Sequence, residues 1–183
     1  MKDYYQKMRR WAVPDFLDHL AAELGECESI LDLGCGSNSP VDYISASYTV
    51  GVDMHGPSLF ESKKKGIHSE NIRANILQIE FKSNSFDAVV ALDLLEHLSK
   101  QEGIELIEKA EQWAKKKVII ASPNGFIPQD AYDDNPHQRH VSGWTFEDFE
   151  SMGFAVCGFH GLRCLRRELH RLRFNHTFFY YTL

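Results

Sequence analysis

The sequence predicts an α/β protein with a doubly wound, mainly parallel β-sheet that has helices on both faces. Short apolar segments typical of buried strands alternate with helix-length segments along most of the chain. The length of 183 residues is enough for one well-buried domain of this class. A composition of 43% hydrophobic and 25% charged residues is that of a globular protein and excludes a disordered one.

Five apolar segments are expected to pair in parallel, because a helix-length segment separates each from the next. They span residues 29–34, 49–53, 71–76, 86–94 and 117–123. Two further strands are expected close to the C-terminus, over 154–161 and 176–183.

Apolar residues at helical spacing predict helices over 14–24 and over 100–116, the second beginning near Glu96 or Ser99. A third helix is expected after Thr145, a favourable N-cap residue that has an acid at the N3 position.

Charge and cysteine usage restrict the classes of partner and compartment. The net charge of −6 argues against broad nucleic-acid binding. No apolar stretch approaches the roughly 20 residues that span a bilayer, and the N-terminus lacks the apolar core of a signal peptide. The four cysteines form no CxxC pair, which favours a reducing, cytoplasmic location.

The segment "ILDLGCGSN" (30–38) runs from a buried strand into a glycine turn, a pattern typical of nucleotide binding. Ser39 stands where a dinucleotide fingerprint has its third glycine, and Asp32 would repel a pyrophosphate but attract a cation. Asp53 ends the next strand 17 residues after Gly36, the spacing of an acid that accepts hydrogen bonds from ribose hydroxyls. A ribose, a cationic amino acid and no phosphate describe S-adenosylmethionine.

On these motifs, residues 25–160 resemble the class I, Rossmann-like S-adenosylmethionine-dependent methyltransferases. The similarity continues through "ANILQIEFKSNSFDAVVALDLLEHL" (74–98) and "KVIIASPNG" (117–125). It implies a seven-stranded sheet whose last strand is antiparallel, and S-adenosylmethionine as the cofactor. The cofactor-binding residues that it implies are Asp32, Gly34, Cys35, Gly36, Asp53, Met54, Asn75, Ile76, Leu92 and Asp93.

Asn75 departs from the family pattern, which often has an aspartate at the position that contacts the adenine amino group. An amide oxygen can still accept that hydrogen bond.

A single domain is expected over residues 1–183, with 27–123 as its cofactor-binding core. Residues 1–26 form an expected N-terminal helical segment, and 124–144 a substrate lid loop, because long loops in compact domains are usually functional. Residues 161–174 form an expected basic amphipathic helix, with leucines on one stripe and arginines mostly off it. That helix either packs on its own domain or docks an anionic partner.

The expected reaction is methyl transfer to a small-molecule acceptor by in-line displacement. Alignment of donor and acceptor in a dry pocket does most of this chemistry, and a base is needed only when the acceptor must lose a proton. The candidate bases are Asp93, His97, His137 and His140, of which His97 and His140 are the proposed catalytic residues.

Two alternatives remain open. Asp93, Glu96, His97 and His140 resemble the metal-ligand set of the small-RNA 3′-terminal 2′-O-methyltransferases. Such a set suits Mn²⁺, Co²⁺ or Zn²⁺ better than Mg²⁺. The other alternative is a non-catalytic, methyltransferase-like binding subunit, which would have no need for Asp32, the two glycines and Asp53.

Overall fold

The computed structural model describes residues 16–131, 135–158 and 177–182. Residues 1–15 of the predicted N-terminal segment and the whole basic segment 161–174 lie outside the described residues. No described helix has the length and apolar character needed to cross a membrane.

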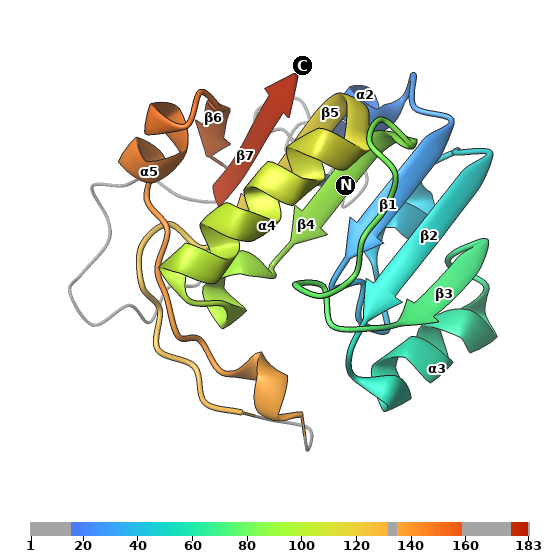
Figure 1. Cartoon of the computed structure of the whole chain (residues 1–183), viewed down its shortest axis with the longest axis horizontal. Helices are drawn as coiled ribbons and strands as arrows, with labels where there is room; N and C mark the ends of the chain where they lie inside the picture. Colours follow the sequence, from blue (N-terminus) through green and yellow to red (C-terminus); the bar gives the residue numbers. More distant parts are fainter. Residues whose placement is uncertain (1–15, 132–134, 159–176, 183) are drawn as a thin grey trace, which may run out of the picture.

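Seven strands form one sheet in the order β3-β2-β1-β4-β5-β7-β6 (Figure 1). They are β1 (Ser29–Leu33), β2 (Tyr48–Asp53), β3 (Glu70–Arg73), β4 (Phe86–Leu92), β5 (Ala114–Ser122), β6 (Ala155–Gly158) and β7 (Thr177–Thr182). Strands β1 to β5 pair in parallel. Strand β7 pairs antiparallel with both β5 and β6. The predicted α/β class is confirmed, and the parallel part of the sheet comprises five strands.

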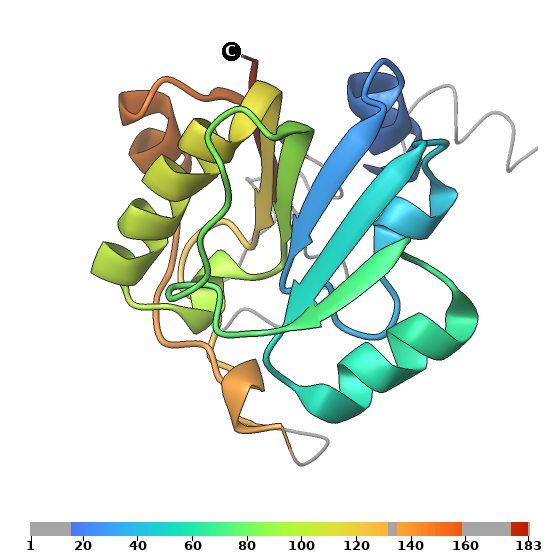
Figure 2. The same ribbon diagram turned by 45° about the vertical axis from the view of Figure 1, so that its right-hand side comes forward.

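Helices cover both faces of the sheet (Figure 2). Helices α4 (Lys100–Trp113) and α5 (Phe146–Ser151) pack on one face, in a core that joins Leu106 and Phe149 to Leu31. Helix α2 (Phe16–Leu24) packs on the other face, where Leu20 contacts the core around Ile30. Helix α3 (Gly56–Lys65) lies against β2 and β3.

Two helix starts follow from their capping residues. Ser99 caps α4 in a capping box with Glu102, so the helix begins after Ser99. Glu96 instead belongs to a 3₁₀ helix, η2 (Leu95–His97). Thr145 caps α5 as predicted, with Asp148 completing the box.

Two boundary predictions are wrong. The strand expected over 71–76 ends at Arg73, the register partner of the last residue of β2, Asp53. The helix expected to run to residue 116 ends at Trp113, and β5 begins at Ala114 rather than at 117. Ala114 is 1% exposed and pairs with Phe86 of β4, so tertiary burial overrides the local helix propensity.

The strand order reverses between β1 and β4, whose connections lead to opposite edges of the sheet. In open α/β sheets a ligand binds outside the carboxyl ends of the strands at such a switch point. The residues that follow these two strands, Gly34 and Leu94, both line a pocket there.

The loop that precedes α5 is packed onto α4 through Trp144. This side chain is 1% exposed, its ring lies 5.3 Å from that of Phe149, and the ammonium of Lys100 lies 4.1 Å from its ring centroid. A Cβ at Gly103 of α4 would lie 2.3 Å from Trp144 Cζ2, so glycine gives the indole its space.

We therefore expect Gly103→Ala to destabilise the protein by about 1–3 kcal/mol through overpacking. Helix propensity alone predicts a gain of about 1 kcal/mol. Urea unfolding shows whether the free energy of unfolding falls or rises. Gln101→Ala, at an exposed position of the same helix, is the control. A more stable Gly103→Ala protein would contradict the packing described here.

Candidate active site

The glycine turn after β1 lies over the carboxyl end of β2. Gly34 and Gly36 have φ angles of 67° and 56°, in the left-handed region that glycine adopts without strain. A Cβ at Gly34 would lie 2.6 Å from Leu94 Cδ1, so glycine allows this turn to approach the exit of β4. The backbone N–H of Gly34 donates to the carbonyl oxygen of Val52 at 2.8 Å, which attaches the turn to β2.

Asp53, the last residue of β2, carries a carboxylate that two backbone groups hold in place. Gly36 N–H donates to Oδ2 at 2.8 Å, and His55 N–H donates to Oδ1 at 2.7 Å. Each carboxylate oxygen has a further lone pair. The two oxygens can therefore accept hydrogen bonds from two adjacent hydroxyl groups.

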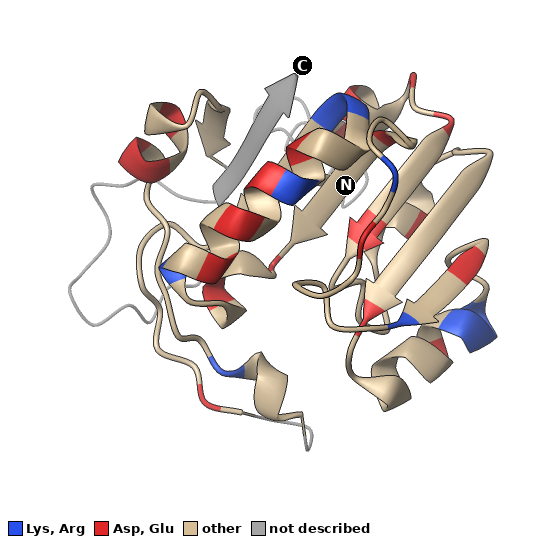
Figure 3. Cartoon of the chain, viewed as in Figure 1, with Lys and Arg blue, Asp and Glu red and all other residues tan. Residues whose placement is uncertain are grey.

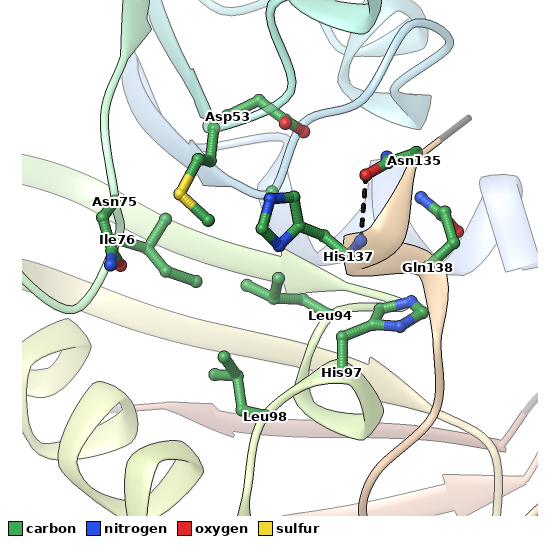
Figure 4. Close-up of a pocket in the computed structure, with 11 residues that line it drawn as sticks. Asp53, Asn75, Ile76, Leu94, His97, Leu98, Asn135, His137 and Gln138 are labelled. Atoms are coloured by element: carbon green, nitrogen blue, oxygen red, sulfur yellow. Dashed lines mark hydrogen bonds between the residues drawn. The ribbon is translucent and has the colours of Figure 1, made fainter. Parts of the chain in front are cut away.

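A pocket opens at the carboxyl ends of β1, β2 and β4 (Figure 4). It is lined by Gly34, Asp53, Met54, Asn75, Ile76, Leu94, His97, Leu98, Asn135, His137 and Gln138. The residues that follow β1, β2 and β3 form one side. The opposite side belongs to a 3₁₀ helix, η3 (Pro136–Gln138), from which the imidazole of His137 points into the pocket. Met54 is 39% exposed and offers an apolar surface for a flat ring.

Glu96, His97 and His140 form a cluster next to the pocket, with one potential ligand atom from each residue within 4.8 Å of the others. His97 Nδ1 lies 3.1 Å from the carbonyl oxygen of Arg139, and His140 Nδ1 lies 2.7 Å from that of Ile127. A carbonyl only accepts, so both Nδ1 atoms donate. In the neutral rings, both Nε2 atoms keep a lone pair for a proton or a metal ion.

Burial makes the charged state of this cluster costly. Glu96 is 3% exposed, and burial, with the nearby charge of Asp93, raises the pKa of its carboxyl to about 8. Burial likewise lowers the pKa of His97 below its usual value, which favours the neutral imidazole. Ser122 Oγ donates to Glu96 Oε2 at 3.3 Å.

The described part of loop 124–144 is attached to the exit of β4. The carbonyl oxygen of Glu96 accepts hydrogen bonds from the N–H groups of Val141 and Ser142, at 2.8 and 3.2 Å. The carbonyl oxygen of Leu95 accepts from Ser142 Oγ and Trp144 Nε1. These contacts hold His140 beside His97 and η3 over the pocket.

A family model described as a methyltransferase domain matches residues 31–121, the segment that contains the glycine turn, Asp53 and η2. The chain belongs to the class I S-adenosylmethionine-dependent methyltransferases. In this family of methyltransferases the methyl donor is S-adenosylmethionine.

Individual relatives agree with that assignment. The chain is 31% identical to the phosphoethanolamine N-methyltransferase of Plasmodium falciparum over 148 residues, which cover 75% of this chain and 55% of that protein. It is 30% identical to the sterol 24-C-methyltransferase of Pneumocystis carinii over 140 residues, which cover 70% of this chain and 36% of that protein. The chain thus spans about half the length of these relatives or less.

Among solved structures, the magnesium protoporphyrin IX methyltransferase of Synechocystis PCC 6803 with bound SAM aligns with a TM-score of 0.61. The two chains are 18% identical, and the alignment covers 91% of this chain and 77% of the other. At this identity the likeness shows a shared fold.

Five of the predicted cofactor-binding residues line the pocket: Gly34, Asp53, Met54, Asn75 and Ile76. So do two of the candidate bases, His97 and His137. Asn75 Oδ1 accepts a hydrogen bond from Leu77 N–H at 3.0 Å, which holds the amide at the edge of the pocket.

The other predicted residues lie around the pocket without lining it. Asp32, at the end of β1, and Cys35, within the turn, are both buried, and burial raises the pKa of the Cys35 thiol. Leu92 packs against the core around Ile30, on the face of the sheet that α2 covers. Asp93 turns the chain at the exit of β4 with a φ of 51°, and it stands outside the cluster formed by the other three alternative metal ligands. Gly36 contributes its N–H to Asp53.

Four lining residues were not predicted from the sequence: Leu94, Leu98, Asn135 and Gln138. The two leucines flank η2, where "DLLEHL" gives an apolar residue on either side of Glu96 and His97. Asn135 is an Asx-type cap of η3, since its Oδ1 accepts from His137 N–H at 3.1 Å. The dipeptide Asn135-Pro136 is a known turn signal that could have located this 3₁₀ helix.

We expect Asp53→Ala to weaken S-adenosylmethionine binding at least about tenfold, because ribose hydroxyls lose a charged acceptor worth about 1.5–3 kcal/mol per bond. Isothermal titration calorimetry measures the change, with the exposed Asp42→Ala as the control. Unchanged affinity would remove Asp53 from the cofactor site.

Proposed function

We propose that this chain transfers a methyl group from S-adenosylmethionine to a small-molecule acceptor by in-line displacement. The supporting observation is one pocket with two chemically different sides. Asp53, Asn75 and Ile76 face it from the cofactor side of the fold. Hydrogen-bonding groups of His97, His137 and Gln138 face it from the other side.

The pocket residues fit the cofactor in kind. The Asp53 carboxylate can accept hydrogen bonds from the ribose hydroxyls, and the apolar side chains of Met54 and Ile76 can pack on the faces of adenine. Because Gly34 has no side chain, the methionine part can approach the backbone of the turn closely. When bound, the cofactor supplies a methyl group on a sulfonium, an already activated leaving group. Leu94 and Leu98 exclude water, and His97 or His140 takes the acceptor proton where one must leave.

A small acceptor is favoured over a polyanion by the charge distribution. Acidic residues recur along α4, at Glu102, Glu105, Glu108 and Glu111, and three more lie in α5 (Figure 3). Such a surface repels a phosphate backbone. The relatives named for phosphoethanolamine and sterol methylation are consistent with a small acceptor.

The Glu96–His97–His140 cluster favours a second candidate, metal-assisted methylation of a hydroxyl such as that of an RNA 3′-terminal ribose. One carboxylate oxygen and two imidazole nitrogens suit Mn²⁺, Co²⁺ or Zn²⁺. A divalent cation would also stabilise the buried Glu96 carboxylate, which the nearby charge of Asp93 disfavours. The cation would supply positive charge next to the acceptor hydroxyl.

We expect His140→Ala to lower turnover at least about tenfold, since positioned proton transfer contributes about 10²–10⁴-fold. The affinity for S-adenosylmethionine should stay nearly unchanged, because His140 does not line the pocket. Candidate acceptors with hydroxyl, amino or carboxyl groups are first screened with the wild type. The rate of S-adenosylhomocysteine release with the accepted substrate then measures turnover. Val141→Ala, at an exposed neighbouring position, is the control. A large loss of cofactor affinity would instead assign His140 to the donor site.

Chelation separates the two candidates. If a metal ion takes part, EDTA should abolish activity and Mn²⁺ should restore it in the wild type but not in Glu96→Gln, which lacks the carboxylate ligand. Full activity in EDTA would exclude the metal-assisted candidate and leave the metal-free transfer.

A further inference from the structure

A buried chain of hydrogen bonds extends from the end of β1 to α3. Asp32 is 2% exposed, and His68, in the connection between α3 and β3, is 6% exposed. His68 Nε2 lies 3.0 Å from Asp32 Oδ2, and Ser39 Oγ donates to the same oxygen. His68 Nδ1 lies 3.2 Å from Ser62 Oγ of α3. Asp32, which lies just before the glycine turn, is therefore hydrogen-bonded to a histidine 36 residues away in sequence.

Gly51 of β2 makes room for this contact. It is the register partner of Asp32, and a Cβ there would lie 2.7 Å from His68 Nδ1 and 2.9 Å from Cys35 Sγ. Glycine inside a strand lowers stability and commonly marks a close approach of another group. Here it allows the imidazole to lie over β2 and reach Asp32.

The partners determine which nitrogen of His68 carries the hydrogen. A carboxylate oxygen only accepts, so Nε2 donates to Asp32. In the neutral imidazole Nδ1 then accepts from the hydroxyl of Ser62. Ser39 also donates as a neutral group. Both hydrogen bonds that the structure shows for the Asp32 side chain fall on Oδ2, and Oδ1 receives neither.

A charge in this position acts on the glycine turn, because buried charges are weakly screened. Cys35 in the turn responds to it: burial raises the pKa of its thiol, and the negative charge of Asp32 raises it further. Gly34, two residues beyond Asp32, lines the pocket. A cationic group bound beside the turn would be attracted by the same charge.

We propose that His68 is a positioning residue for cofactor binding: its Nε2–H holds Asp32 as an oriented carboxylate that attracts the amino group of the cofactor's methionine part. The proposal rests on the proposed cofactor site and extends it to a residue that does not line the pocket.

Two ligands separate this role from a merely structural one. S-adenosylhomocysteine has the amino acid part, whereas 5′-methylthioadenosine has the same adenosine and thioether without it. By calorimetry, His68→Leu should bind S-adenosylhomocysteine at least about tenfold more weakly, as for the loss of a charge-assisted contact. Its affinity for 5′-methylthioadenosine should change less than about twofold. His68→Gln, whose amide nitrogen can replace Nε2 as the donor, should retain both affinities.

An equal loss for both ligands in His68→Leu, or no loss for either, overturns the proposal. If His68→Leu fails to fold, Ser39→Ala removes the other donor to Asp32 Oδ2 and should show the same selective loss. Equal loss or no loss in that variant likewise overturns the proposal. A wild-type protein that binds neither ligand would instead overturn the proposed cofactor site itself.

Discussion

The hydrogen bond from Gly36 N–H to Asp53 Oδ2, 2.8 Å long, joins the ends of two neighbouring strands, and the pocket depends on it. It can form only because the chain enters the left-handed region at Gly34 and Gly36 and turns back toward β2. The same turn lets Leu94 approach from the exit of β4. This hydrogen bond therefore holds Asp53, the expected ribose acceptor, next to the glycine turn, and both lie with Leu94 around the same pocket.

The acceptor side depends on a different set of contacts, which connect a long loop to η2. The carbonyl oxygen of Glu96 accepts from the N–H groups of Val141 and Ser142. That of Leu95, which also accepts from Leu98 N–H in η2, accepts from the side chains of Ser142 and Trp144. The two sides of the pocket are therefore built by different parts of the chain. The cofactor side is made by strand ends, whereas the acceptor side is made by side chains of a loop, the part of a fold that varies with substrate.

Local patterns in the sequence were enough to predict the α/β class, the strands that end at the pocket, and Asp53. Each of these leaves a signal within a few residues, such as an apolar run or two glycines one residue apart. The contact of His68 with Asp32 leaves no such signal, because it joins residues that are distant in sequence and depends on the register of Gly51. The exact start of β5 was missed for a similar reason, since Ala114 is fixed by pairing with Phe86 rather than by its neighbours. Asn135 and Gln138 stand in an irregular loop, where no periodicity indicates which side chains face inward.

A crystal structure of the protein with S-adenosylhomocysteine tests the central claim most directly. The account predicts both ribose hydroxyls within hydrogen-bond distance of the Asp53 carboxylate, adenine between Met54 and Ile76, and the amino acid part beside Gly34 above Asp32. Ligand density away from the carboxyl ends of β1 and β4, with Asp53 making no contact to the ribose, would contradict it.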